Sequence, residues 1–275
     1  MSENDVKILV CGMSRSGSTL LVKVLKRYFK KYHDKDMQVF PGKYYYNASL
    51  PKQIFIARCQ NYISKLHLRR EKIRLKEPIS EFMKEFDLFF LTKRDIRDAL
   101  ASEIISLNSR ELSRILKTSK TISQEKIRSI SRTLHKEHDL WFRELCEWCN
   151  HEDLVFFDWK YESYKEDQIA TFKNVFSYVK AAYPFVHDLT EDEIIDLLEE
   201  IEKPVELSDI YNEMYSKTTR RARFTRIATH ARERISAFSS TGGKVGYYKQ
   251  FFTEKHQKYI KKEYKEWLRF NGYTR

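Results

Sequence analysis

Residues 6–25 read VKILVCGMSRSGSTLLVKVL, and the class of fold is most evident here. Its first part, Val6–Cys11, is a short apolar run rich in β-branched residues, which predicts a buried strand that ends at Gly12. From Leu20 to Tyr32 the apolar residues recur at helical spacing, which predicts a helix. The order strand, short glycine-containing loop and helix is typical of the start of an α/β fold.

The connecting loop, GMSRSGST at residues 12–19, has the context of a phosphate-binding loop, because it follows a strand and opens a helix. Its backbone amides and the positive end of the helix dipole can bind an anion. Nucleoside triphosphatases have the pattern G-x-x-x-x-G-K-[ST], whereas this chain has Ser18 after the second glycine and Arg15 inside the loop. Since the usual lysine serves the β- and γ-phosphates, its absence predicts a different transferable group. The alternative is an ordinary strand-to-helix turn.

The rest of the chain extends this pattern. Asp87–Thr92 and Leu154–Asp158 predict further buried strands, and Lys72–Lys76 predicts a weaker one. Helical patterns separate the strands, so we expect an α/β fold with a parallel β-sheet flanked by helices on both faces, in three layers. From Asp167 onward the pattern is almost wholly helical, most clearly over 192–202 and 253–270, which predicts a helix-rich C-terminal half. No interdomain linker interrupts the chain, and we expect a single domain over residues 1–275.

Composition narrows the class of protein. The 51 Lys and Arg residues exceed the 39 Asp and Glu residues, and the net charge of +12 favours either anionic partners or a well-solvated surface. Four cysteines are too few for a disulfide framework, so we expect a reducing, cytoplasmic location. Cys146 and Cys149 form a C-x-x-C in a predicted helix without a second pair, which argues against a zinc site. No apolar stretch reaches about 18 residues, so no transmembrane segment is expected and the protein should be soluble.

Glycine is distributed unevenly. Five of the 7 glycines fall in two short loops at opposite ends of the chain, namely Gly12, Gly17, Gly242, Gly243 and Gly246. Glycine is needed where the backbone turns tightly or approaches a ligand closely. We therefore expect the two loops to form two walls of one ligand site.

The first loop resembles that of the sulfotransferase family that uses 3′-phosphoadenosine 5′-phosphosulfate (PAPS). The family's 5′-phosphosulfate loop reads as a cation, Ser or Thr, Gly, and two Ser or Thr residues before an apolar helix. The matching residues here are Arg15, Ser16, Gly17, Ser18 and Thr19. The resemblance implies that they bind the cofactor. Many members have Lys at the first position; because Arg does not readily lose a proton, the catalytic role of Arg15 should be electrostatic.

A second motif resembles the family's site for the 3′-phosphate. There an Arg at the end of a later strand and a Ser eight residues on, inside the next helix, bind the phosphate together. FFLTKRDIRDALAS at residues 89–102 supplies Arg94 and Ser102 at this spacing. A guanidinium offers phosphate a planar fork and a hydroxyl adds a further donor. The alternative is a set of surface ion pairs among the charged residues at 94–98.

A third motif, TGGKVGYYKQFFT at residues 241–253, resembles the family's C-terminal cofactor loop. It implies cofactor contacts from Gly243, Lys244, Val245 and Gly246. Many members have Arg-Lys before the first glycine, where this chain has Thr241 and Gly242, so Arg232, Arg234 or Lys244 would have to supply the missing charge. Tyr161 matches a weaker motif, a Tyr-Glu pair whose Tyr often lies near the adenine; the alternative is a packing aromatic.

The resemblance implies a fold and an activity together. It implies a P-loop-like sulfotransferase domain that transfers the sulfuryl group of PAPS to an acceptor hydroxyl or amine, including those of carbohydrates, and releases 3′-phosphoadenosine 5′-phosphate (PAP). No metal is required, and nucleic acid is not an expected partner. Two other functions stay open: a kinase with a degenerate phosphate loop, with Asp158 as its Mg²⁺ ligand, and a non-catalytic polyanion-binding protein.

The acceptor must lose a proton during transfer, so a general base is expected. In the family a His or Glu after the second strand usually serves. Glu77, after the weak strand at 72–76, is the expected base, and an exposed turn carboxylate is the alternative. His67 lies in a predicted helical segment before that strand, whereas His135 and His138 lie in a long predicted helix and rank next.

Overall fold

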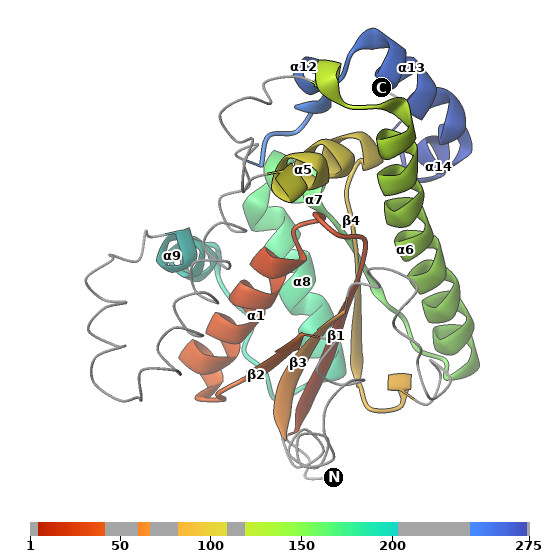
Figure 1. Cartoon of the computed structure of the whole chain (residues 1–275). Helices are drawn as coiled ribbons and strands as arrows, with labels where there is room; N and C mark the ends of the chain where they lie inside the picture. The colour runs from red at the N-terminus through yellow and green to blue at the C-terminus, as the bar shows by residue number, and fades with distance from the viewer. Residues whose placement is uncertain (1–4, 42–59, 67–81, 109–118, 203–242, 274–275) are drawn as a thin grey trace, which may run out of the picture.

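The computed structural model describes residues 5–41, 60–66, 82–108, 119–202 and 243–273. In this part of the chain all strands belong to one sheet with the order β2-β3-β1-β4-β5, and every neighbouring pair is parallel (Figure 1). The strands are β1 (Val6–Gly12), β2 (Gln38–Pro41), β3 (Asn61–Leu66), β4 (Leu88–Lys93) and β5 (Phe157–Lys160). The predicted parallel sheet is confirmed.

Helices follow the strands and dominate the second half of the described chain. They are α1 (Ser18–His33), α5 (Ile96–Asn108), α6 (Gln124–His151), α7 (Tyr161–Glu166), α8 (Gln168–Ala182), α9 (Glu191–Glu202), α12 (Tyr248–Phe251), α13 (Glu254–Glu263) and α14 (Lys265–Phe270). No helix in the described segments is long and apolar enough to cross a membrane.

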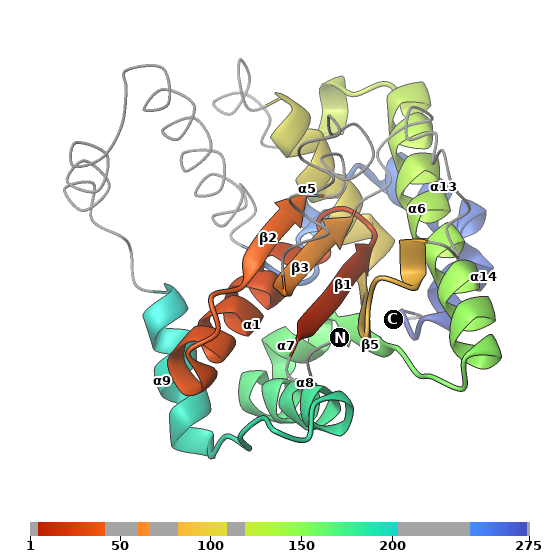
Figure 2. The ribbon, with the colours of Figure 1, turned by 90° about the horizontal axis from the view of Figure 1, so that it is seen from below.

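The central strand β1 shows why the sheet is covered on both faces. Successive strand residues point to opposite faces. Ile8 and Val10 belong to a core cluster with side chains of α1 and α8, whereas Leu9 and Cys11 belong to a second cluster with side chains of α6. Figure 2 shows α1 and α8 on one side of the sheet and α6 on the other. A strand buried on both faces reads as a continuous apolar run, which is why β1 was evident in the sequence.

The structure departs from the sequence prediction in three places. Residues 61–66, for which no strand is predicted, form β3, because pairing with β1 and β2 on either side satisfies their backbone groups. The predicted strand Leu154–Asp158 starts later, at Phe157, since Leu154 and Val155 lie in the connection from α6 and are 42% and 71% exposed. The predicted helix over 253–270 is two helices, α13 and α14, that meet at Tyr264. The weak strand Lys72–Lys76 lies outside the described residues.

Gly12 fixes the point at which β1 becomes the loop. Its φ is +124°, and a Cβ at this position would lie 2.2 Å from the backbone oxygen of Thr92 on β4. Only glycine has both the backbone freedom and the space for this close approach. The loop therefore leaves the sheet directly beside the end of β4.

Candidate functional site

The candidate site lies at the carboxyl edge of the sheet, where parallel strands end together. The loop at residues 12–17 follows β1, Arg94 follows β4, and Tyr161 follows β5. Ligands of open α/β sheets bind outside the carboxyl ends of the strands. The parallel topology thus places three of the sequence motifs at one edge.

The Tyr161 side chain joins the two glycine loops. A Cβ on Gly17 would lie 2.5 Å from Cδ2 of Tyr161, and a Cβ on Gly243 would lie 2.3 Å from its hydroxyl oxygen. The Tyr161 hydroxyl also donates a hydrogen bond to the Gly243 carbonyl oxygen at 3.1 Å. Both glycines have positive φ, which suits glycine. The structure therefore brings the N-terminal and C-terminal loops together at one buried ring, as expected from the glycine distribution.

Arg94 is buried beside this ring. It is 2% exposed, its Nη2 donates to the Lys244 carbonyl oxygen at 2.9 Å, and its guanidinium carbon lies 4.6 Å from the ring centroid of Tyr161. Its Nε is buried without a hydrogen-bond partner among the described residues. A buried, unpaired N–H on a charged group costs free energy, so this atom fits a site built to receive an anion. Because Arg94 is buried, it does not form one of the surface ion pairs that were the alternative interpretation of residues 94–98.

Asp98, in the first turn of α5, binds backbone amides of the C-terminal glycine loop. The Asp98 carboxylate accepts hydrogen bonds from the backbone amides of Gly246 at 2.6 Å and Tyr248 at 2.9 Å. Burial raises the pKa of Asp98, and its two backbone hydrogen bonds oppose that shift. Arg97 pairs with Asp95 and lies 4.3 Å over the Tyr248 ring. The loop that carries Lys244 and Val245, both exposed, is thus fixed at both ends.

Glu162 is a further buried carboxylate that the sequence motif contained but did not explain. It accepts hydrogen bonds from the Asp95 amide at 2.9 Å and from the Tyr273 hydroxyl at 3.0 Å. Burial raises its pKa. Glu162 therefore ties β5, the start of α5 and the C-terminal segment together, which accounts for the Tyr-Glu pair in structural terms.

The other end of the phosphate loop reaches α5. Arg15, which has a positive φ of 68°, forms an ion pair with Glu103, with Nε 3.1 Å from Oε2. Its Nη2 donates to the Ser102 carbonyl oxygen at 3.5 Å. The structure therefore brings Arg15 and Ser102 together, although they are 87 residues apart in the chain.

The hydroxyls of the loop have partners within the protein. Ser16 Oγ lies 2.6 Å from the Met13 carbonyl oxygen and 2.8 Å from Thr92 Oγ1, so it braces the loop against β4. Thr19 Oγ1 accepts a hydrogen bond from Lys65 of β3. Ser18 is buried in the first turn of α1. The Ser16 side chain therefore has a structural part in shaping the loop.

Two side chains that contact the loop lie outside the sequence motifs. Lys65 lies near the end of β3, a strand that the sequence does not predict. Glu137 lies on α6, is 3% exposed, and accepts a hydrogen bond from the Ser14 amide at 3.0 Å. Its signal is present in the sequence, because a carboxylate at 137 interrupts the apolar face formed by Leu134 and Trp141.

The alternative base residues in α6 take part in helix packing. His138 is buried, its Nδ1 accepts a hydrogen bond from Trp267 Nε1 at 3.2 Å, and its ring stacks on Phe142. His135 contacts the rings of Tyr264 and Trp267. These contacts place both imidazoles between α6 and the two C-terminal helices. Glu77, His67, Arg232, Arg234, Thr241 and Gly242 lie outside the described residues.

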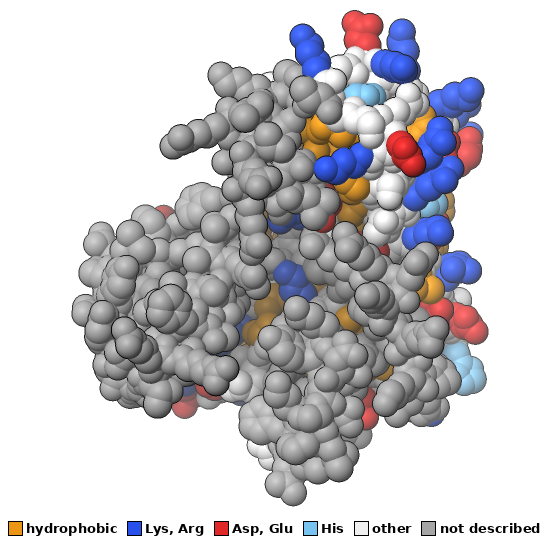
Figure 3. Space-filling view, in the orientation of Figure 1, with side chains coloured by type: hydrophobic (Ala, Val, Ile, Leu, Met, Phe, Trp, Pro, Cys, Tyr) orange, Lys and Arg blue, Asp and Glu red, His pale blue; other side chains and the backbone are white. Residues whose placement is uncertain are grey.

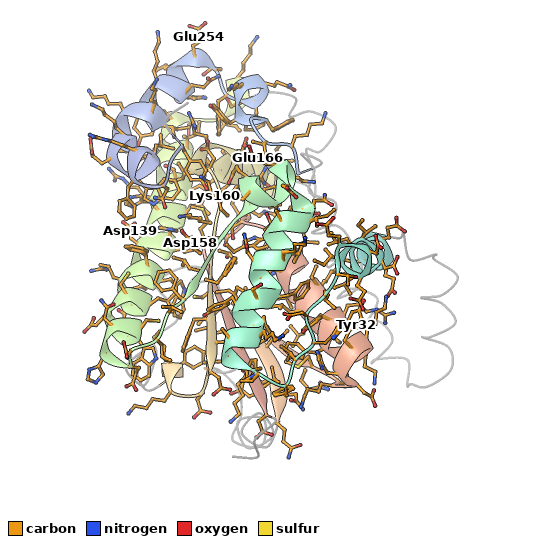
Figure 4. All side chains as sticks on the ribbon, turned by 180° about the vertical axis from the view of Figure 1, so that it is seen from behind. Tyr32, Asp139, Asp158, Lys160, Glu166 and Glu254 are labelled. Atoms are coloured by element: carbon orange, nitrogen blue, oxygen red, sulfur yellow. The ribbon has the colours of Figure 1, made fainter. Side chains whose placement is uncertain are left out.

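The proposed Mg²⁺ ligand of the kinase alternative has another role. Asp158 lies on β5 and forms an ion pair with Lys93 of β4, on the side of the molecule shown in Figure 4. The described residues contain no group of three or more His, Cys, Asp or Glu side chains that could hold a metal ion. Cys11, Cys146 and Cys149 are free thiols.

Comparison with known proteins finds similarity among solved structures. No protein-family model matches the chain, and no curated protein matches its sequence. Among solved structures, it is similar to the crystal structure of mouse sulfotransferase SULT7A1 complexed with PAP, with a TM-score of 0.54 and 14% identity. The match covers 98% of this chain and 86% of that one. At this identity the likeness concerns the fold, and the chain has the fold of a sulfotransferase.

Proposed function

We propose that the protein is a PAPS-dependent sulfotransferase that acts on an acceptor hydroxyl or amine. The observation that carries the proposal is Arg94, a buried guanidinium beside Tyr161, where the two glycine loops meet. Its Nε–H has no hydrogen-bond partner in the described part of the chain. The solved structure of the same fold contains PAP. An anion-receiving group at this edge suits the 3′-phosphate that distinguishes PAPS from ordinary adenine nucleotides.

Each part of the site has a task in this proposal. Arg94 and Ser102 would hold the 3′-phosphate, Tyr161 would lie against the adenine, and the amides of residues 16–19 would hold the 5′-phosphosulfate. Gly243, Lys244, Val245 and Gly246 would close the site from the C-terminal side. PAPS supplies an activated sulfuryl group, whose bond to phosphate breaks as negative charge gathers on the leaving oxygen. Arg15 would stabilise that charge, and this stabilisation is larger in the transition state than in the ground state.

The acceptor proton needs a base near the phosphate loop. Two residues compete for this role, Glu77 and His67. β3 lies beside β1 in the sheet and its Lys65 contacts Thr19, so β3 ends at the loop. His67 is the next residue in the chain after β3. The family resemblance calls for a His or Glu after such a strand, and with β3 as that strand His67 takes precedence over Glu77.

A thermal-shift comparison tests the proposed function. PAP is expected to raise the melting temperature, because a ligand that binds only the folded state stabilises it by RT ln(1 + [L]/Kd), about 2.7 kcal/mol at a hundredfold excess over Kd. Stabilisation by Mg-ATP and not by PAP would instead support the kinase alternative. Stabilisation by neither nucleotide would support the third alternative, a polyanion-binding protein. A surface for such a partner is present, because Lys and Arg side chains gather over α13 and the neighbouring part of α6 (Figure 3).

Transfer is expected to need no divalent metal. The terminal sulfuryl group carries less charge than a γ-phosphate, so Arg15, the loop amides and the α1 dipole can neutralise it. The measurement is turnover of PAPS with and without EDTA, and the two rates should agree within about twofold. An activity that EDTA abolishes and Mg²⁺ restores would contradict this expectation and favour the kinase.

A further inference from the structure

We propose that Tyr273 is a positioning residue for the 3′-phosphate, because it holds Arg94 in place through Glu162 and Asp95. This inference rests on the proposed function, since it concerns the nucleotide of the same site. It assigns the C-terminal segment a role in cofactor recognition. None of the sequence motifs includes Tyr273.

The chain turns back after α14 and buries Tyr273. Gly272 has a φ of +75°, which suits glycine, and its amide donates to the Arg269 carbonyl oxygen at 3.1 Å. The Tyr273 amide donates to the Leu268 carbonyl oxygen at 2.7 Å. These two hydrogen bonds form the Schellman motif that ends many helices. Tyr273 is 7% exposed as a result, and its ring stacks on Trp267 with 5.7 Å between the ring centroids.

Two polar groups of Tyr273 contact the segment that follows Arg94. The Tyr273 hydroxyl donates to Glu162 Oε2 at 3.0 Å, and Glu162 Oε1 accepts from the Asp95 amide at 2.9 Å. Arg97 Nη2 donates to the Tyr273 carbonyl oxygen at 3.0 Å, and it lies 2.6 Å from Asp95 Oδ2. Asp95 is therefore held at its amide and at its carboxylate, and both links lead to Tyr273.

These links reach the candidate site through residues that are adjacent in the chain. Asp95 follows Arg94, and Glu162 follows Tyr161. The Arg94 guanidinium carbon lies 4.6 Å from the ring centroid of Tyr161, so a shift of either backbone segment moves the guanidinium relative to a bound phosphate. A planar fork binds phosphate well only when supporting hydrogen bonds fix its geometry. Tyr273 provides such support from outside the ligand site.

Loss of the Tyr273 hydroxyl would remove a donor from the Glu162 carboxylate. Burial raises the pKa of Glu162, and the hydrogen bond from Tyr273 opposes that shift. A carboxylate that loses a donor away from water is destabilised and moves towards other partners. The Asp95 amide, which donates to the same carboxylate, is then expected to move with it.

The test compares two ligands that differ by the 3′-phosphate. Tyr273→Phe removes the hydroxyl and keeps the ring, and calorimetry measures the affinities for PAP and for adenosine 5′-phosphate. The preference for PAP is expected to fall about three- to tenfold, the size of coupling between residues of one hydrogen-bond network. It falls because Arg94 serves a phosphate that only PAP has. Affinity that both ligands lose through a loosened loop cancels in this ratio.

A double-mutant cycle shows whether Arg94 carries the effect. If Tyr273 acts through Arg94, Tyr273→Phe should leave the preference unchanged in a protein that already has Arg94→Ala. Independent roles would instead give effects that add. Glu162→Gln removes the charge at the centre of the same link and should also lower the preference for PAP. It decides the question if Tyr273→Phe does not fold.

Tyr183→Phe is the matched control. Tyr183 is 5% exposed, and its hydroxyl donates to Asp87 Oδ2 at 3.1 Å, so the substitution removes the same kind of hydrogen bond from another buried tyrosine. Asp87 precedes β4, whereas Arg94 follows it, so the control lies at the opposite end of that strand. Tyr183→Phe and Tyr273→Phe should both lower the melting temperature, but Tyr183→Phe should leave the preference for PAP unchanged.

The outcomes distinguish the inference from the proposed function. A natural protein that does not bind PAP would overturn both. If PAP binds, the inference alone fails when the natural protein has no preference for PAP over adenosine 5′-phosphate, or when folded Tyr273→Phe protein keeps that preference. It also fails when Tyr183→Phe lowers the preference equally, or when the effects of Tyr273→Phe and Arg94→Ala add. A preference that falls with Tyr273→Phe, and falls no further in the Arg94→Ala protein, would support it.

Discussion

Substitution of His67 by Asn is expected to lower turnover about 10²- to 10⁴-fold while PAP affinity changes by less than about twofold, because a general base acts in the transition state. Histidine is the side chain that most often serves as a general base. We choose His67 because it directly follows β3 in the sequence. This strand pairs with β1, and its Lys65 donates a hydrogen bond to Thr19 of the phosphate loop. The measurement is steady-state turnover of PAPS with any accepted substrate, alongside calorimetry with PAP.

Glu77→Gln is the matched comparison, since it removes the competing base and keeps its shape. Its turnover should stay within about tenfold of the natural protein. His138→Gln is a second comparison, and because His138 packs against Trp267, we expect it to lower stability more than turnover. An inactive Glu77→Gln protein that still binds PAP, together with an active His67→Asn protein, would return the base to Glu77.

Substitution of Arg94 by Ala is expected to weaken PAP binding about ten- to a hundredfold more than it weakens binding of adenosine 5′-phosphate. A charge-assisted contact with phosphate is worth about 1.5 to 3 kcal/mol. PAP would lose this contact, whereas adenosine 5′-phosphate has no 3′-phosphate and never makes it. Arg94 also binds the Lys244 carbonyl and covers Tyr161, so both ligands should lose some affinity through the loosened loop. The quantity to measure by calorimetry is therefore the ratio of the affinities for PAP and adenosine 5′-phosphate.

Two further variants sharpen this result. Arg94→Lys keeps the charge and removes the planar fork, so its loss should be intermediate. Lys93→Ala removes a neighbouring cation that pairs with Asp158, and the ratio should not change. Equal losses for both ligands in Arg94→Ala would remove Arg94 from the 3′-phosphate site and assign it to the packing of the C-terminal loop.

The candidate site was only partly readable from the sequence. Motifs of local spacing identified the loop at 12–19, Arg94 and Tyr161, because loop geometry and strand ends leave signals within a few residues. Glu137 leaves a weaker signal, and Glu103 leaves none that we recognise. Their contacts with Arg15 and Ser14 join residues 88 and 123 positions apart. Such partners are set by how α5 and α6 pack at the sheet edge, which the periodicity of either helix does not reveal.

The class of fold and the first loop of the candidate site follow from the sequence alone. β1 is buried on both faces and is therefore an unbroken apolar run, and Gly12 and Gly17 mark the turns on either side of the loop. The strand at residues 61–66, which the sequence does not predict, is seen only in the tertiary structure. The backbone groups of β3 are satisfied by pairing with β1 on one side and β2 on the other, and these partners are distant in the sequence. The same pairing brings Lys65 to the phosphate loop, because parallel strands end at one edge.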